Sequence, residues 1–356
     1  MSPLAAAVER AALLVCVGAG GVGKTSTSAA LGVAAARRGR RAVVVTIDPA
    51  RRLADALGVA GVGNRPVVVP GPWPGTLTAV MLDTASTFDD VVRLTAPDPE
   101  QAERIVANRF YRNIADTLSG TREYMAGEKL LELLEGGGHD IVIVDTPPSE
   151  RALDFLEAPG RLVRLLDHRV YRALVTPVRG YGRALHLATR GFLRAAGRLV
   201  GSELVDDAVA FFAAFEGMDA GFRARADRVR TWLHDPATAY VLVVAPRSDA
   251  LAGAHALREQ LEAAGIRLDA VVVNRVHPHR GDAAAARRSA DELAGTDLGA
   301  LWANLADLAA VAEDEDAALA ALAGAAPSVR VPSLEREVTD LDALGLLADR
   351  LVPAPP

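Results

Sequence analysis

A glycine-rich turn between an apolar run and a helical pattern constrains this chain more than any other feature. Residues 13–32 read LLVCVGAGGVGKTSTSAALG, so five apolar residues lead into a loop that is mostly glycine. An apolar run of this length, ended by glycine, predicts a buried strand, and residues 24–38 show helical spacing. The chain therefore begins with a strand, a glycine-rich loop and a helix, the arrangement with which α/β folds bind phosphate groups.

The loop satisfies two phosphate-binding motifs. Gly18 to Gly23 fit G-x-G-x-x-G, and Asp48 ends the next apolar run, about where a dinucleotide fold places its ribose-binding acid. The same residues fit G-x-x-x-x-G-K-[ST], which ends in Gly23, Lys24 and Thr25. In that motif backbone N–H groups surround the phosphates, the lysine reaches their oxygens and the hydroxyl ligates Mg²⁺.

The use of lysine rather than arginine at position 24 favours the second motif. Lys24 and Lys129 are the only lysines, and arginine supplies every other Lys or Arg position. The planar fork of arginine cannot replace a compact ammonium among phosphates. A lysine at this position is required by a nucleotide triphosphatase and not by a dinucleotide fold. We therefore interpret the loop as an ATP site, with a nicotinamide-dependent oxidoreductase as the remote alternative.

Apolar runs along the chain predict a doubly wound, mostly parallel α/β sheet. The runs lie at 13–17, 42–47, 77–82, 140–145, 240–245 and 269–273, with helical patterns at 24–38 and 248–264 between them. Two long stretches, 84–138 and 159–235, have helical spacing and no strand pattern. We predict that they form one helical subdomain, inserted twice into a core made of residues 11–83, 139–158 and 236–356.

Two aspartates follow predicted strands. Asp145 ends the run in IVIVDTPPSE (141–150), a position from which a carboxylate orders Mg²⁺ and its waters. The alternative for Asp145 is a capping or turn carboxylate. Asp48, in VVVTIDPARRLADALG (43–58), emerges at the carboxyl end of its strand, the edge at which such sheets bind ligands. There it could position or polarise the attacking water, while residues 146–150 could sense the γ-phosphate.

The loop, TIDPARRLADALG, DTPP and VVVNR (271–275) occur together in this order. This combination resembles the ATPase family of the arsenite-pump ATPase and the tail-anchored-protein targeting factor, over almost the whole chain. Actinobacterial members are especially similar, with their GAGGVGKT loop and an EYMA-x-EKL segment, here residues 123–130. The resemblance implies a P-loop NTPase that hydrolyses ATP with Mg²⁺ at a dimer interface. Hydrolysis would drive a helical subdomain that handles a client or membrane protein; the alternative is an ATPase subunit coupled to a transporter, anion efflux or a small-molecule process.

The resemblance also implies roles for single residues. Lys24 and Asp48 would be catalytic, Thr25 would ligate Mg²⁺, and Asp145 would hold the ion through water. Residues 331–337 (VPSLERE) look like the late loop that packs on the base. The residues implied to bind ATP are Gly20, Gly21, Val22, Gly23, Lys24, Thr25, Ser26 and Asn274, the last as the adenine-reading asparagine.

Three departures from the family pattern limit what the resemblance implies. Ala19 stands where family loops carry a signature lysine that reaches the partner's nucleotide, and Arg247 replaces a family carboxylate. The single cysteine, Cys16, leaves no zinc-binding pair and no arsenite site. We expect no zinc, and we favour a heterodimer with a homologous ATPase subunit over a homodimer; otherwise Arg51 or Arg247 would supply the missing cation.

The remaining expectations concern partners and location. Residues 159–201 interleave leucines with arginines, a pattern that can cover an apolar helical client, meet an anionic membrane surface, or simply pack on its own core. Net charge −6 excludes a global basic field for nucleic acid. Without a signal peptide or an apolar run of membrane-spanning length, we expect a cytoplasmic protein, or one peripheral at a membrane. The acidic run 313–316 is interpreted as a solvated helix start, and His277 and His279 as no metal site.

Overall fold

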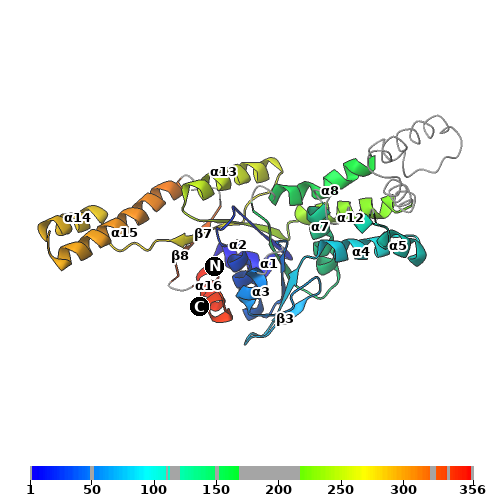
Figure 1. Ribbon diagram of the computed structural model, residues 1–356, viewed down its shortest axis with the longest axis horizontal. Helices are drawn as coiled ribbons and strands as arrows, with labels where there is room; N and C mark the ends of the chain where they lie inside the picture. The colour runs from blue at the N-terminus through cyan, green and yellow to red at the C-terminus, as the bar shows by residue number, and fades with distance from the viewer. Residues whose placement is uncertain are drawn as a thin grey trace. The chain divides into compact units, whose positions relative to one another are not determined.

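The computed structural model describes residues 2–48, 52–109, 111–112, 121–148, 152–167, 217–320, 326–334 and 337–353. The chain folds into two compact units (Figure 1). The first, called the sheet unit, comprises Met1–Met81, Gly137–Leu153 and Pro236–Pro356. The second, called the helical unit, comprises Leu82–Gly136 and Asp154–Asp235. The chain therefore leaves the sheet unit twice and returns twice.

The sheet unit contains an eight-stranded sheet in the order β3-β4-β2-β5-β1-β6-β7-β8. The strands are β1 (Leu13–Val17), β2 (Arg41–Thr46), β3 (Val67–Val69), β4 (Thr76–Met81), β5 (Ile141–Asp145), β6 (Thr238–Val244), β7 (Ala270–Val276) and β8 (Ser328–Pro332). Every pairing is parallel except that of β3 with β4. The prediction of a mostly parallel α/β sheet is confirmed, although the two edge strands β3 and β8 were not predicted.

The sheet unit also contains helices. They are α1 (Pro3–Arg10), α2 (Lys24–Arg37), α3 (Arg52–Leu57), α13 (Ser248–Ala263), α14 (Ala283–Glu292), α15 (Asp297–Leu319) and α16 (Leu341–Leu351). From β1 the chain crosses through α2 toward β2, and from β6 it crosses through α13 toward β7 on the other side of β1. Because such crossovers are right-handed, α2 and α13 cover opposite faces of the sheet. The buried central strands β1 and β5 lie between them, and Cys16 of β1 is a buried thiol.

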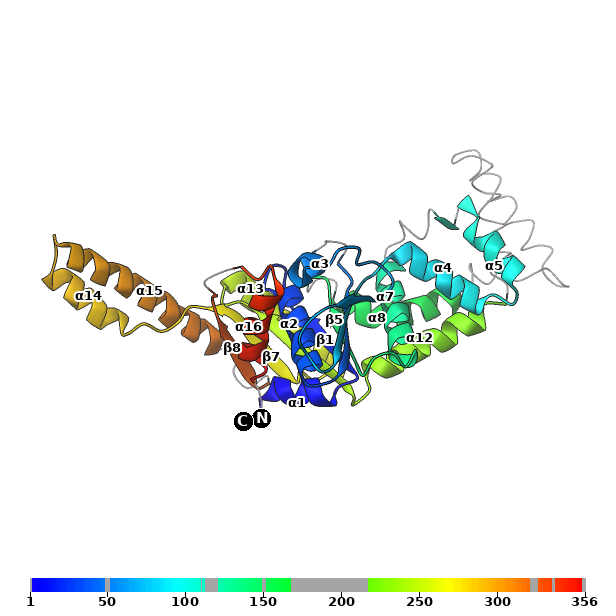
Figure 2. The same ribbon diagram turned by 90° about the horizontal axis from the view of Figure 1, so that it is seen from below.

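Helices α14 and α15 form a hairpin between β7 and β8 that extends away from the sheet (Figures 1 and 2). Thr296 caps the start of α15 by accepting from the N–H of Gly299 at 3.0 Å. The acidic run 313–316 lies late in this helix, so its interpretation as a solvated helix start is wrong. Glu315 is 8% exposed and its carboxylate lies 2.6 Å from Nδ1 of His277.

The helical unit is built from α4 (Thr84–Thr95), α5 (Pro99–Val106), α7 (Thr121–Glu135), α8 (Ala152–Asp167) and α12 (Asp219–Leu233), of which α8 begins in the sheet unit. Its core holds Phe88, Tyr111, Tyr124 and Phe222. Most of the interleaved Leu and Arg stretch at 159–201 lies outside the described residues. Among the helices that the structure describes, none is long and apolar enough to span a membrane.

Candidate functional site

The glycine-rich loop joins the end of β1 to the start of α2 at the carboxyl edge of the sheet. Gly18 and Gly23 have φ angles of 154° and 95°, which L side chains rarely adopt. A Cβ at Gly18 would lie 2.1 Å from the carbonyl oxygen of Val243, and a Cβ at Gly23 would lie 2.2 Å from Nδ2 of Asn274. Both glycines are therefore required by backbone conformation and by the close approach of β6 and β7.

Lys24, the first residue of α2, turns its side chain back over the loop. Its Nζ donates to the carbonyl oxygens of Gly18 at 2.9 Å and Ala19 at 2.8 Å. Burial lowers the pKa of Lys24, and the nearby carboxylate of Asp145 acts in the opposite direction. The loop thus gathers one buried ammonium and the N–H groups at the N-terminus of a helix, which together favour an anion.

Asp145 ends β5, beside both β1 and β2. Its Oδ2 accepts hydrogen bonds from the hydroxyls of Thr25 at 2.7 Å and Thr46 at 3.0 Å. Its Oδ1 is buried and has no hydrogen-bond partner among the residues that the structure describes. Burial raises the pKa of Asp145 to about 6, although the hydrogen bonds from the two threonines lower it. The contacts are with side-chain hydroxyls rather than with the N–H groups of a helix end, so the structure does not show a capping carboxylate.

A cavity of about 380 Å³ opens in front of this group. The predicted residues that line it are Gly20, Gly21, Gly23, Lys24, Thr25, Ser26, Asp48 and Asp145. Thr46 connects two of them, because its hydroxyl also accepts from the N–H of Asp48 at 3.3 Å. Val22 and Asn274 are buried beside the cavity, where Nδ2 of Asn274 donates to the carbonyl oxygen of Val22 at 2.9 Å.

The donor set of the cavity fits Mg²⁺ with a nucleotide phosphate. A threonine hydroxyl and a carboxylate with one uncommitted oxygen are hard oxygen donors, which Mg²⁺ prefers. The ammonium and the glycine backbone face the same cavity from the loop.

Comparison with known proteins agrees with this geometry. A model of the anion-transporting ATPase (ArsA) family matches residues 11–293. The chain belongs to this family. Its mostly parallel sheet and glycine-rich loop are the P-loop fold of that family.

Individual relatives of this ArsA-family chain come from bacteria and fungi. It is 34% identical over 269 residues to an uncharacterized protein of Streptomyces coelicolor, covering 74% of this chain and 62% of that protein. It is 30% identical over 153 residues to the ATPase GET3 of Malassezia globosa, covering 43% and 44%. It is 25% identical over 265 residues to the ATPase GET3 of Phaeosphaeria nodorum, covering 73% and 74%. The first two matches span less than two thirds of those relatives.

Arg275 is a site residue of this ArsA-family chain that the sequence analysis missed. Among the described residues it is the one non-glycine residue with positive φ, at 61°. It lies at a bulge in β7, because the pairing with β8 shifts between Asn274 and Val276. The bulge directs its guanidinium to the loop, where Nη1 donates to the carbonyl oxygen of Gly21 at 3.2 Å, and Arg275 lines the cavity. Bulges often re-aim side chains in this way, and nothing in VVVNR signals one.

The other predicted positions fall beside or outside the described cavity. Arg51 is outside the described residues, while its neighbour Arg52 lines the cavity. Arg247 is not among the lining residues, and its Nη2 pairs with Asp249 at 2.9 Å. Residues 335 and 336 of the predicted late loop are not described, but Val338 and Thr339, just beyond it, line the cavity.

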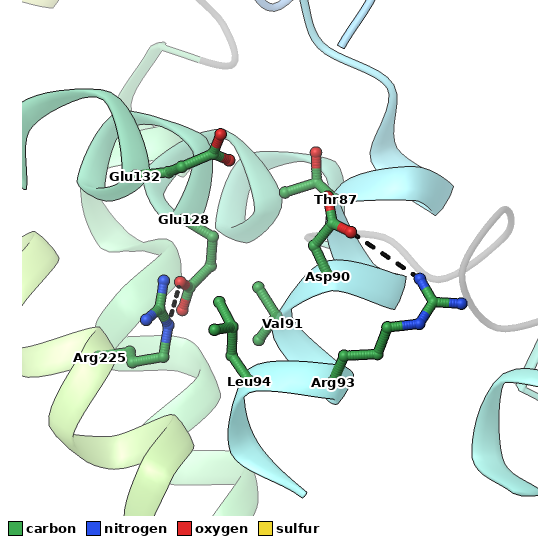
Figure 3. A pocket seen from close by; sticks show the side chains of 8 residues that line it. All are labelled: Thr87, Asp90, Val91, Arg93, Leu94, Glu128, Glu132 and Arg225. Atoms are coloured by element: carbon green, nitrogen blue, oxygen red, sulfur yellow. Dashed lines mark hydrogen bonds and ion pairs between the residues drawn. The ribbon is translucent and has the colours of Figure 1, made fainter. Parts of the chain in front are cut away.

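A second pocket, of about 340 Å³, lies in the helical unit (Figure 3). It is lined in part by Glu128 of the EYMA-x-EKL segment, whose carboxylate pairs with Nε of Arg225 at 2.6 Å and accepts from the hydroxyl of Tyr124. Lys129, also buried, pairs with Glu132 at 2.8 Å. Since these charges have partners within the protein, this segment has a structural role in the helical unit.

Proposed function

We propose that this chain binds ATP with Mg²⁺ in the cavity at the end of β1 and hydrolyses it there. The observation that carries the proposal is the carboxylate of Asp145. One oxygen accepts a hydrogen bond from the hydroxyl of Thr25 at the start of α2, and the other is buried and has no partner among the described residues. Binding of a dinucleotide does not require a lysine, a threonine hydroxyl and a carboxylate around one phosphate position.

Each residue of the cavity has a separate role in the proposed binding and hydrolysis of ATP. Backbone N–H groups of residues 20–26 bind the phosphates, and the ammonium of Lys24 offsets charge on the β- and γ-phosphate oxygens. Thr25 and Asp145 would hold Mg²⁺, the latter through water, and the ion would neutralise phosphate charge. Asp48 orients the attacking water, and Asn274 is the proposed contact to adenine.

The first experiment separates the ATPase from the oxidoreductase. In a thermal-shift assay Mg-ADP should raise the melting temperature, and NADH should not. Lys24→Ala should abolish the Mg-ADP shift, whereas Arg247→Ala, a charge removed away from the cavity, should keep it. Stabilisation by NADH without stabilisation by Mg-ADP would refute the proposal.

The second experiment concerns Asp48. Asp48→Asn preserves size but removes the charge, so ATP affinity should survive while kcat falls by a factor of about 100 or more, because alignment of the water is lost. Equal losses in binding and turnover would assign Asp48 a structural or metal-binding role instead.

The proposed pairing of this chain with a second subunit rests on Ala19. Its methyl group cannot supply the cation that family loops extend to a partner's nucleotide, and Arg247 is engaged by Asp249. We therefore favour pairing with a homologous ATPase subunit that retains the lysine. The isolated chain should hydrolyse ATP slowly, the partner should raise the rate, and replacing the partner's lysine should remove the gain. Full activity of the isolated chain, unchanged by any related subunit, would contradict this.

The cellular role we propose is nucleotide-driven handling of a hydrophobic helix or membrane protein by the helical unit. The support is the resemblance to targeting ATPases and the similarity to fungal GET3 proteins. The Asp48→Asn variant held in the ATP state should enrich single-span membrane proteins in a pull-down. Recovery of only a permease or an enzyme would instead indicate an ATPase subunit of a transporter or small-molecule process.

A further inference from the structure

Arg52 is a cation at the nucleotide cavity that no acidic side chain engages. It is exposed at the start of α3 and lines the cavity together with Asp48. Among the residues that the structure describes, none makes a hydrogen bond or an ion pair with its guanidinium. The other two cations of the lining, Lys24 and Arg275, donate to carbonyl oxygens of the glycine-rich loop. The N–H donors of Arg52 are therefore available to a bound anion.

The packing of α3 sets the position of Arg52. Leu53, Ala56 and Leu57 are buried in the core of the sheet unit. Their spacing of three and four residues places them on one face of the helix. Arg52 and Asp55 are exposed and line the cavity, three residues apart on the same helix, and no ion pair joins them. The guanidinium thus stays at the cavity although an acid lies on the same helix.

The topology of the sheet assigns Arg52 to one end of the cavity. Arg52 follows β2, on one side of β1, whereas Asn274, the proposed adenine contact, belongs to β7 on the other side. The N–H of Asp48 donates to the hydroxyl of Thr46 at 3.3 Å, and that hydroxyl donates to Asp145 at 3.0 Å. The β2 side is thus joined to the proposed Mg²⁺ site. Because Mg²⁺ bridges the β- and γ-phosphates, Arg52 lies at the end of the terminal phosphate.

The charge of Arg52 acts on the ammonium of Lys24. Burial is the largest cause that lowers the pKa of Lys24, and the positive charge of Arg52 lowers it further. The carboxylates of Asp145 and Asp48 act in the opposite direction. An anion beside the two cations would offset their mutual repulsion, whereas Asp48 alone would repel a terminal phosphate. The charges therefore favour a phosphate group in contact with Arg52.

We propose that Arg52 binds the γ-phosphate of ATP and that this contact makes the site prefer ATP to ADP. The inference rests on the proposed ATPase function and adds a residue that recognises the third phosphate. A guanidinium donates two parallel hydrogen bonds to phosphate oxygens, and ADP has no acceptor at that position. The contact serves the nucleotide held by the same chain, so it does not depend on the proposed pairing through Ala19.

The first test compares ADP with the β,γ-imido analogue of ATP, by isothermal titration calorimetry with Mg²⁺. Arg52→Ala should weaken binding of the analogue by about tenfold or more and binding of ADP by less than about twofold. Arg247→Ala removes an exposed arginine outside the lining of the cavity, so it is the matched control and should change neither affinity.

The second test isolates the γ-phosphate position with a single nucleotide. Beryllium fluoride occupies the place of the γ-phosphate beside bound ADP, so it should tighten ADP binding to the unmodified chain. In Arg52→Ala this gain should be about tenfold smaller. Because Arg52 has no protein partner in the described part of the chain, Arg52→Ala should also keep the melting temperature of the unmodified chain without nucleotide.

The outcomes separate this inference from the proposed function. If the unmodified chain binds neither ADP nor the imido analogue, the ATPase proposal fails and the role of Arg52 fails with it. If the chain binds both, the role of Arg52 alone is overturned by an Arg52→Ala variant that weakens the two nucleotides equally, or that leaves both affinities unchanged. An undiminished gain from beryllium fluoride in Arg52→Ala would overturn it as well.

Discussion

Arg275 offers a test in which glycine should be more stabilising than alanine. With a φ of 61°, a non-glycine residue at this position costs about 1–2 kcal/mol of backbone strain. Arg275→Ala keeps this strain and loses the exposed 3.2 Å hydrogen bond to Gly21, worth about 0.5–1 kcal/mol. Arg275→Gly loses the same bond but relieves the strain, against a backbone-entropy cost of about 0.5–1 kcal/mol. The glycine variant should therefore exceed the alanine variant in unfolding free energy by about 1 kcal/mol.

Both variants should bind nucleotide equally poorly. A guanidinium contact to a phosphate contributes about 1.5 kcal/mol, which is roughly tenfold in affinity. Urea denaturation gives the two unfolding free energies, and titration with a fluorescent ATP analogue gives the dissociation constants. Arg247→Ala is the control, because its exposed pair with Asp249 lies outside the lining of the cavity. It should change neither quantity.

Two results would refute this reasoning separately. Equal stability of the alanine and glycine variants would show that Arg275 does not adopt the left-handed conformation. Unchanged nucleotide affinity in both variants would show that its guanidinium does not face the bound phosphates.

Two further substitutions test the helical unit and the loop. Arg225→Met removes the partner of Glu128, whose side chain is fully buried, and should cost about 3–5 kcal/mol near neutral pH. Burial raises the pKa of Glu128, and Arg225 acts in the opposite direction. The pKa of Glu128 in the folded variant should therefore rise further. The loss of unfolding free energy should then grow as the pH increases above about 4.5. Gly23→Ala places its Cβ 2.2 Å from Nδ2 of Asn274, so the loop must shift, and nucleotide binding should be lost at a stability cost of about 2 kcal/mol.

Matched controls separate these effects from general damage. Arg230→Met, on the same helix as Arg225 but in an exposed pair, should cost less than about 1 kcal/mol at any pH. Gly39→Ala has a similar φ of 80° with no atom within 4 Å of the added Cβ, so it should keep nucleotide binding. A pH-independent loss in Arg225→Met, or tight nucleotide binding by Gly23→Ala, would contradict the structure.

The central fold was predictable because its signals are local. Buried parallel strands such as β1 and β5 are continuous apolar runs, and α2 and α13 lie between strands as their spacing predicted. The proximity of Asp48 and Asp145 follows from the same logic, because the carboxyl ends of neighbouring parallel strands share one edge. The loop motif then identifies that edge.

The features that escaped prediction depend on distant partners. Strand β3 has three residues, and β8 is half exposed and contains Arg330, so neither forms an apolar run. The bulge that turns Arg275 toward the loop exists only through the register of β7 with β8. The burial of Glu315 depends on His277, which is 38 residues away. No sequence window of helical or strand length contains both members of such a pair.

Asp145 belongs both to the nucleotide cavity and to the hydrogen bonds that join the sheet to α2. This double role limits which substitutions related proteins can accept at this position. One carboxylate joins β5 to β2 through Thr46 and to α2 through Thr25. A descendant that no longer needs nucleotide chemistry is free to lose Lys24, but losing Asp145 alone would leave buried hydroxyls without their acceptor. We expect inactive relatives to retain the Asp145–Thr46 pair, or to replace both with apolar side chains together. The presence of this aspartate is therefore a poor marker of an active ATPase, and the lysine is the better one.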